Sequence, residues 1–294
     1  MAKYSIKELE NLSGIKAHTI RIWEKRYGVI EPRRTDTNIR YYSDDDLKRL
    51  LNISILNRNG MRISEISRLS DADISEKVMN VSYESGSADS QIEGMIIAMV
   101  DLDELKFDRI LSRFIMHEGF ENAVTKIIFP FFEKIGILWQ TGTINPAQEH
   151  FVSNLFRQKL MVAIDNLHIA DVQSAKKFVM FLPEGEYHEL GLLFFNYLIK
   201  KAGNQVYYLG SSVPFQDLIE TSKMVKPDYL FTSFTCSIQT QEYQDYIHKL
   251  AKSFPFQTIL LTGSFASERV NNMPSNIVKI TNPSELSEFL KGIV

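Results

Sequence analysis

The sequence predicts a multidomain chain: an α-helical winged helix-turn-helix, then a four-helix bundle, then an α/β doubly wound parallel sheet. Two capped helices and a basic hairpin come first, a segment with apolar residues at three- and four-residue spacing follows, and short apolar strands then alternate with helices. With 294 residues and 44% hydrophobic content, the chain can bury two or three ordinary cores. The expected parts are residues 1–75, a small and polar linker at 76–90, a bundle at 91–170 and a sheet domain at 175–294.

Charge is divided unevenly along the chain. Residues 1–70 contain 14 Lys and Arg against 9 Asp and Glu, whereas residues 71–294 contain 19 against 27, so a head of +5 precedes a body of −8. A basic head on an acidic body is typical of a DNA-binding module attached to a module that does not bind DNA.

Several classes of protein are excluded by composition. The single cysteine, Cys236, excludes an internal disulfide framework and a multi-thiolate metal site within one subunit, and with them redox or mercury-type sensing. No apolar run approaches the length of a membrane span, and the first residues lack the apolar core of a secretion signal. We therefore expect a cytoplasmic protein with no membrane partner.

Two helices separated by a turn open the chain. Ser5 can cap the first helix, and Glu8, three residues later, completes a capping box. Ser13 and Gly14 end that helix, and a second helix with basic residues on its polar faces is expected over residues 16–27. This is a helix-turn-helix pattern, in which the second helix enters the major groove of DNA.

A β-hairpin wing is predicted over residues 31–42, where turn residues lie between basic and aromatic flanks. Tyr41 or Tyr42 is expected to pack or hydrogen-bond along the sugar backbone, and Ser43 then caps a third helix. The three arginines expected to contact phosphate oxygens are Arg33, Arg34 and Arg40.

This head resembles the MerR-family winged-helix domain over residues 3–73, through the segments 4–9, 19–24, 26–28 and 40–43. The resemblance implies dimers that bind double-stranded promoter or operator DNA. The alternative is that the arginines form a merely solvated face. The residues expected at DNA are Thr19, Arg21, Arg26, Tyr27, Arg33, Arg34, Arg40 and Tyr41.

A four-helix bundle is predicted between residues 92 and 167, with breaks near residues 101–103, 119 and 141–143. Within it, nine residues separate Trp139 from the pair Glu149-His150. Taken alone, such a tryptophan belongs to a core and such a pair to an exposed helix face. The spacing is what favours a site.

Five strands with intervening helices predict a doubly wound, Rossmann-like sheet, which binds ligands at its carboxyl edge. The strands are expected at 177–182, 205–209, 229–232, 258–262 and 277–280. His188 lies in the first strand-to-helix loop, where an imidazole can bind a metal ion axially if an acceptor orients its other nitrogen. Glu186 is a candidate acceptor and Gly191 permits close approach, although a loop histidine is often merely solvated.

These two patterns resemble MerR regulators of the CarH and LitR type, which bind cobalamin. The resemblance implies that His188 is the lower axial ligand of the corrinoid cobalt and displaces the cofactor's own base. It also implies that Trp139 and Glu149 hold the adenosyl group of adenosylcobalamin, with His150 lining the same upper pocket. At position 186 the wider cobalamin-binding family commonly has Asp. This chain has Glu there, and so does the CarH group.

The displaced base would enter the sheet crevice beside Ser233 and Gly263. Two positions depart from the family. Thr262 replaces the first glycine of a Gly-Gly pair, and Gln140 stands where light-responsive relatives have a histidine that captures cobalt. Because glutamine is a poor cobalt ligand, cobalamin binding is better supported than a photochemical end state, and methylcobalamin is the alternative form.

The resemblance implies a cobalamin-dependent transcriptional regulator, not an enzyme: a repressor, dimeric or tetrameric, whose operator binding is controlled by adenosylcobalamin and light. One alternative is a MerR-like regulator with a corrinoid-free sensor domain that responds to another ligand or protein. Another is a corrinoid methyl-carrier protein, against which the DNA-binding head argues. Gln140 and Thr262 leave the corrinoid-free reading open.

Overall fold

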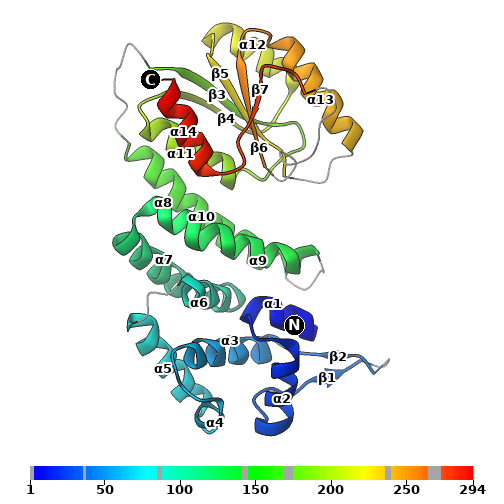
Figure 1. Ribbon diagram of the computed structural model, residues 1–294, viewed down its shortest axis with the longest axis vertical. Coiled ribbons are helices and arrows are strands. Elements are labelled where there is room, and N and C mark those ends of the chain that lie inside the picture. Colours follow the sequence, from blue (N-terminus) through cyan, green and yellow to red (C-terminus); the bar gives the residue numbers. More distant parts are fainter. Residues whose placement is uncertain are drawn as a thin grey trace. The chain divides into compact units, whose positions relative to one another are not determined.

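The computed structural model describes residues 3–35, 38–84, 88–140, 145–167, 175–235, 240–263 and 273–293. The chain forms two compact units, residues 1–155 and residues 156–294, which are described separately below. Figure 1 shows the helical first unit and the α/β second unit. No helix in the described ranges is long and apolar enough to cross a membrane.

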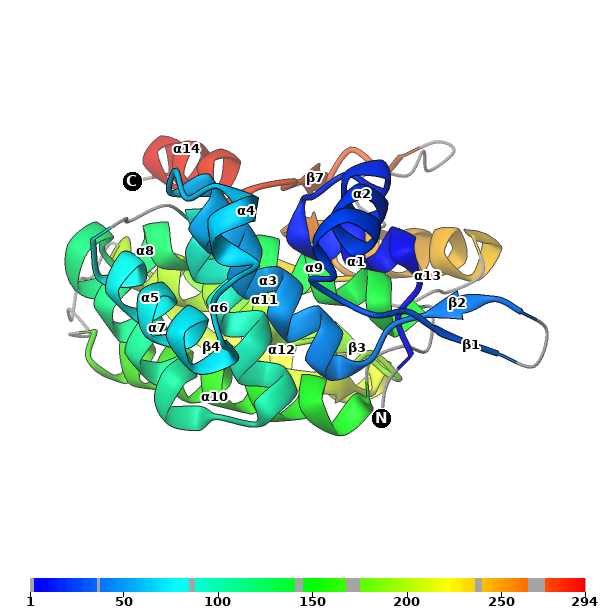
Figure 2. The same cartoon turned by 90° about the horizontal axis from the view of Figure 1, so that it is seen from below.

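The head of the first unit begins with the predicted helix-turn-helix. Ser5 accepts from the Glu8 amide and the Glu8 carboxylate accepts from the Ser5 amide, so the capping box is present. Gly14, with φ of 70°, ends the first helix in the left-handed region that glycine tolerates. Figure 2 shows the β1–β2 hairpin extending away from the head helices. The elements are α1 (Ile6–Ser13), α2 (Ala17–Tyr27), β1 (Arg33–Arg34), β2 (Arg40–Tyr41), α3 (Asp44–Arg58) and α4 (Ile63–Ile66).

The head core includes Tyr42, one of the two tyrosines considered for the sugar backbone of DNA. Tyr42 is fully buried, pairs with Tyr4 through two backbone hydrogen bonds of 2.9 Å, and donates its hydroxyl to Glu24. Burial raises the pKa of Tyr42 to about 12, so this hydroxyl stays a donor. Tyr42 therefore joins the wing to α2, and of the two tyrosines only Tyr41 is partly exposed.

The predicted linker over residues 76–90 is largely helical. Helix α5 (Asp71–Glu84) and helix α6 (Ala88–Asp101) cover all of it except 85–87, which lie outside the described residues. Ser70 caps α5 through the Asp73 amide, and Ile74 and Val78 are buried against α3. The polar composition wrongly indicated a linker. Ile74 and Val78, four residues apart, lie on one side of α5 and pack it against α3.

The bundle packs on α6, in which every residue from Ser90 to Met99 is buried. Helix α6 contacts α7, η1 and α9 directly, and Phe107 meets Phe131 edge to face at 6.1 Å. The breaks predicted near residues 101–103 and 119 occur, whereas the one predicted at 141–143 lies outside the described residues. A π-helical turn, η1 (Val124–Ile128), interrupts the third helix. The remaining elements are α7 (Glu104–Glu118), α8 (Phe120–Ala123), α9 (Phe129–Gln140) and α10 (Pro146–Asp165).

The second unit contains a five-stranded parallel sheet of order β4-β3-β5-β6-β7. Strand β3 therefore has β4 on one side and β5 on the other, which makes this the point where the strand order reverses. The strands are β3 (Lys177–Pro183), β4 (Gln205–Val213), β5 (Tyr229–Ser233), β6 (Thr258–Thr262) and β7 (Ile277–Lys279).

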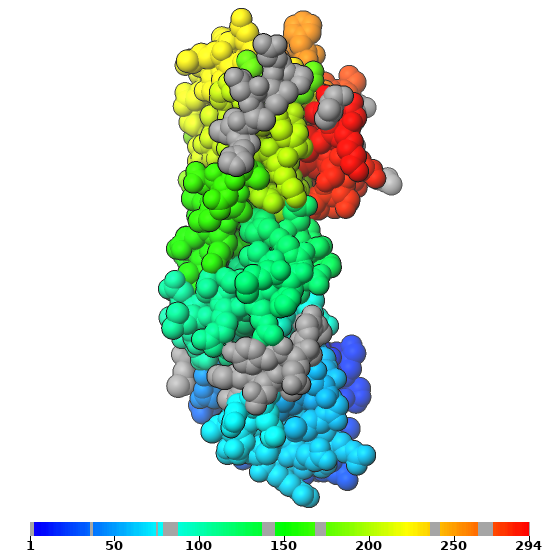
Figure 3. All heavy atoms as spheres, turned by 90° about the vertical axis from the view of Figure 1, so that its left-hand side faces the viewer, coloured from blue at the N-terminus to red at the C-terminus, as the bar shows by residue number. Residues whose placement is uncertain are grey.

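Helices cover both faces of this sheet. Val179, Leu230 and Ile259 face the core under α12 (Phe215–Val225) and α13 (Thr240–Ser253). On the other face, α11 (Leu190–Lys201) and α14 (Pro283–Gly292) pack against each other and the sheet, and Figure 3 shows them side by side. Alternate residues of each strand point to opposite faces of the sheet. Because helices cover both faces, most strand residues are apolar. The two layers leave the carboxyl edge available for a site.

Candidate functional site

The loop that follows β3 is held by the ends of neighbouring strands. Gly185, with φ of 85°, donates to Ser212 Oγ at 3.1 Å, and the Ser212 amide donates to the Glu186 carbonyl at 3.0 Å. Ser212 itself has φ of 54°, an uncommon conformation for serine. These contacts fix the backbone from which Glu186 and His188 project.

The Glu186 carboxylate is buried and receives hydrogen bonds from two loops. Its Oε1 accepts from the amides of Tyr187 at 2.9 Å and His188 at 3.0 Å, and its Oε2 accepts from the amide of Thr235 at 2.8 Å. Three backbone donors stabilise the negative charge of this buried carboxylate. Glu186 thus joins the loop after β3 to the loop after β5, across the point where strand order reverses.

His188 is oriented by that carboxylate. Its Nδ1 lies 2.8 Å from Glu186 Oε1, and its side chain is 58% exposed. An ionised carboxylate can only accept, so in the neutral imidazole Nδ1 carries the hydrogen and Nε2 carries the lone pair. The loop therefore contains the contact between Glu186 and one imidazole nitrogen, whereas metal binding by the other nitrogen stays a prediction.

Three further predicted residues lie around this edge. Gly191 is in the first turn of α11, and Ser233 is a buried residue at the end of β5. Gly263 follows β6 with φ of 98°, and a Cβ built on it would lie 2.2 Å from the Phe234 carbonyl oxygen. The glycine at position 263 is therefore required by the crossing of two loops, whether or not a ligand lies beside it.

An ion pair that sequence reasoning missed lies next to the histidine. Glu189, at the N-cap of α11, pairs with Arg157 of α10 and accepts from the Tyr208 hydroxyl at 3.3 Å. Both members of the pair are partly or fully buried, with side-chain exposures of 35% and 10%. Their separation by 32 positions in the chain left no local signal for this contact.

The predicted upper-pocket residues belong to the first unit. Trp139 and Gln140 are the last residues of α9, and their side chains lie outside what the structure describes. Glu149, in the first turn of α10, accepts from Ser153 Oγ at 2.5 Å and lies 3.6 Å from His150 Nε2. The His150 side chain is 71% exposed.

The predicted DNA-binding side chains lie on α2 and on the wing. Arg21 and Arg26 are exposed on α2, Thr19 and Tyr27 are partly exposed there, and Arg33, Arg34 and Arg40 are exposed on the hairpin. The Arg40 guanidinium lies 3.7 Å from Glu24, and Lys3 lies over the Tyr41 ring at 5.0 Å. The exposed residues of this set on the second helix and the wing are therefore all arginines.

Comparison with known proteins finds matches to the head and to the helical bundle. Residues 4–73 match the family described as MerR HTH family regulatory protein, and residues 91–163 match the family described as B12 binding domain. The chain is 29% identical over 258 residues to the HTH-type transcriptional repressor CarH of Myxococcus xanthus, which covers 86% of this chain and 85% of that protein. It is 24% identical over 258 residues to the repressor CarA of the same organism, covering 87% and 85% respectively.

A solved structure supports the fold. The Methanosarcina barkeri monomethylamine corrinoid protein aligns with a TM-score of 0.57 and 14% identity, covering 71% of this chain and 100% of that one. The curated relatives are transcriptional regulators, so the expectation of a regulator that is not an enzyme is confirmed.

Proposed function

Because the chain is a MerR-family transcriptional regulator that carries a B12-binding domain, we propose that it binds adenosylcobalamin and that His188 holds the cobalt through Nε2. The observation that carries this proposal is the contact of 2.8 Å between His188 Nδ1 and Glu186 at the carboxyl edge of the sheet. The Glu186 charge increases the basicity of the ring, and the three backbone donors to Glu186 hold it in place.

The residues at this edge fit a corrinoid. His188 would supply an imidazole to the cobalt from an exposed loop. Cobalamin, when bound, would supply a cobalt ion with an exchangeable ligand. Ser233 and Gly263 are the residues proposed to line the pocket for the nucleotide base that His188 displaces.

Trp139 and Glu149 are proposed to hold the adenosyl group, with His150 beside them. A Trp ring offers a stacking surface and a carboxylate accepts from ribose hydroxyls or the adenine amine. Glu149 already accepts from Ser153, which fixes its rotamer within α10.

For the head, we propose that the regulator represses transcription by binding operator DNA with the α2 face and the wing. Thr19, Arg21, Arg26 and Tyr27 would enter the groove, while Arg33, Arg34, Arg40 and Tyr41 would contact the backbone. Assembly into dimers or tetramers would raise affinity, because linked heads reach two half-sites at a high effective concentration.

Control by light is the finer part of the proposal. Gln140 would supply only an amide, a poor cobalt ligand, at the position where light-responsive relatives have a histidine that captures cobalt. The repressor would then respond to the form of cobalamin present, with or without illumination.

The test is an absorbance spectrum of the purified protein mixed with adenosylcobalamin in the dark, desalted and then illuminated, with size-exclusion elution before and after. Retained cofactor with a spectral change and a change in size supports a light-controlled regulator. Retained cofactor with no change in size supports a cobalamin sensor alone. No retention of adenosylcobalamin or methylcobalamin would favour a sensor for another ligand or protein.

His188→Ala should retain less cofactor, and His248→Ala, an exposed histidine on α13 of the same unit, is the matched control. If the two variants retained cobalamin equally, His188 would not be the ligand.

A further inference from the structure

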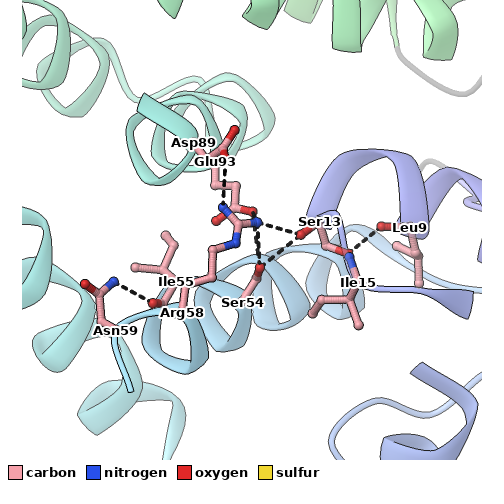
Figure 4. Close-up of polar contacts among 9 residues, drawn as sticks. All are labelled: Leu9, Ser13, Ile15, Ser54, Ile55, Arg58, Asn59, Asp89 and Glu93. Atoms are coloured by element: carbon pink, nitrogen blue, oxygen red, sulfur yellow. Dashed lines mark hydrogen bonds and ion pairs between the residues drawn. The ribbon is translucent and has the colours of Figure 1, made fainter. Parts of the chain in front are cut away.

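A charged side chain is fully buried where the helical bundle meets the head. Glu93, on α6, is 0% exposed and pairs with Arg58 at the end of α3. Figure 4 shows the two side chains meeting beside Ser54 and Ser13. Ser54 Oγ lies 3.2 Å from Glu93 Oε1, so the carboxylate contacts two residues of the head helix α3.

The same polar groups hold the turn of the helix-turn-helix. The Ser13 carbonyl accepts from Arg58 Nη2 at 2.8 Å and from Ser54 Oγ at 3.0 Å. Ser13 is the last residue of α1, its hydroxyl donates to the Leu9 carbonyl, and it accepts from the Ile15 amide at 3.2 Å. Arg58 and Ser54 are therefore hydrogen-bonded to Ser13, which lies at the turn between α1 and α2.

Glu93 is fixed in the bundle, not in the head. Its neighbour Gly94 allows α7 to approach so closely that a Cβ there would lie 2.9 Å from Ile110 Cδ1. Lys134, on α9, is near enough for its charge to act on Glu93. Helix α9 also carries Trp139 and contacts α1.

The carboxylate is in an environment that does not favour its charge. Burial raises the pKa of Glu93 to about 7, despite the positive charges of Arg58 and Lys134 that lower it. Within the described part of the chain, Glu93 Oε2 is buried with no hydrogen-bond partner. An apolar pair of similar volume would commonly stabilise the contact between α3 and α6 at least as well as this buried ion pair.

We propose that Glu93 and Arg58 are positioning residues for DNA recognition: Glu93, anchored in the bundle, holds Arg58 against the turn between α1 and α2 and so orients the DNA-reading helix. A shift of α6 or α9 on cofactor binding would then reach α2 through this contact. That last link rests on the proposed cobalamin function, whereas the effect on DNA binding does not.

The test measures the affinity of the full chain for a duplex that the parent protein has selected from a random-sequence library, by fluorescence anisotropy at several salt concentrations. Glu93→Gln should weaken binding roughly fivefold to tenfold at about pH 8, the size expected when one contact of a coupled network is lost. This direction is informative, because removal of a negative charge would by electrostatics alone strengthen DNA binding. Glu118→Gln on α7, whose surface partner is Lys126 at 3.1 Å, is the matched control and should bind like the parent.

Arg58→Gln should weaken binding by a similar factor without reducing the salt dependence, since a phosphate contact would reduce the slope by about 1. The double variant should be no weaker than either single variant, because both lose the same contact. Arg58 is 33% exposed, so its variant tests the proposal even if Glu93→Gln does not fold, which circular dichroism would show.

The pH dependence separates a charge effect from a merely structural one. The groups that face Glu93 are Arg58 and Ser54 on α3, Lys134 on α9, the Ser13 carbonyl on α1 and, beyond Arg58, Asp89 on α6 at 3.9 Å. The difference between parent and Glu93→Gln should shrink as the pH falls below about 7, because the parent carboxylate becomes protonated there.

Equal DNA affinity of folded Glu93→Gln and Glu118→Gln would overturn the proposal, as would a loss that is independent of pH. Cobalamin retention is measured on the same samples by absorbance. If the parent retains no cobalamin, the cofactor proposal fails while the effect of Glu93 on DNA binding is still decided.

Discussion

Glu93→Gln should change how the stability of the protein depends on pH. Burial raises the pKa of Glu93 from 4.5 to about 7 in the folded state, while the unfolded chain retains the ordinary value. The folded state therefore binds more protons between these two values, and the contribution of Glu93 to stability is present below about pH 4.5 and lost as the pH rises through about 7. Glutamine does not titrate, so the variant lacks this dependence.

The size of the effect follows from the same shift. At about 1.4 kcal/mol per pKa unit, the parent loses about 3 kcal/mol from this group between about pH 4 and pH 8, relative to the variant. For a unit of this size, that corresponds to a relative change in melting temperature of roughly 6 to 12 °C. The side chain is fully buried, so solvent screening reduces this free-energy difference only slightly.

Differential scanning calorimetry of the full chain at several pH values, for the parent, Glu93→Gln and Glu118→Gln, measures this directly. Glu93→Gln should gain on the parent as the pH rises, whereas Glu118→Gln should run parallel to the parent. A gap between parent and Glu93→Gln that is the same at about pH 5 and about pH 8 would refute the reasoning.

Three other outcomes are expected. Glu186→Gln should reduce cobalamin affinity about tenfold or more, because the residue that orients His188 Nδ1 loses its charge, and equilibrium dialysis against adenosylcobalamin would show parental affinity if the role is wrong. Gly263→Ala should destabilise the second unit by about 2 kcal/mol or more, since its Cβ meets the Phe234 carbonyl at 2.2 Å and φ is 98°, and an unchanged urea midpoint would contradict this. Arg21→Ala and Arg40→Ala should each weaken DNA binding with little effect on cobalamin retention, and a phosphate contact made by Arg40 would show as a salt slope lower by about 1.

Local signals predicted much of the fold. The capping residues Ser5 and Ser43 begin helices as expected, because a cap is decided by side chains three positions apart. The strand at 258–262 has the predicted bounds. Pairing of Glu186 with His188 could likewise be anticipated, since only two positions separate them.

Contacts between distant residues could not be predicted. Arg58 and Glu93 are 35 positions apart, and on sequence alone the arginine could equally face solvent. Alternation of strands and helices does not fix the strand order, so the meeting of the loops after β3 and β5 appeared only in the structure. Tyr41 and Tyr42 are adjacent and chemically identical, and only the pairing of Tyr4 with Tyr42 decides which one is buried.

The ion pair between Arg157 and Glu189 affects how the chain could be divided into fragments. The second compact unit begins at Phe156, so the last part of α10 belongs with the sheet although the expected domain began at residue 175. A fragment cut at 175 would leave the carboxylate of Glu189 without its cation, one residue from His188. A fragment that begins at Pro146 keeps all of α10, and we expect only this longer piece to fold with its histidine loop intact.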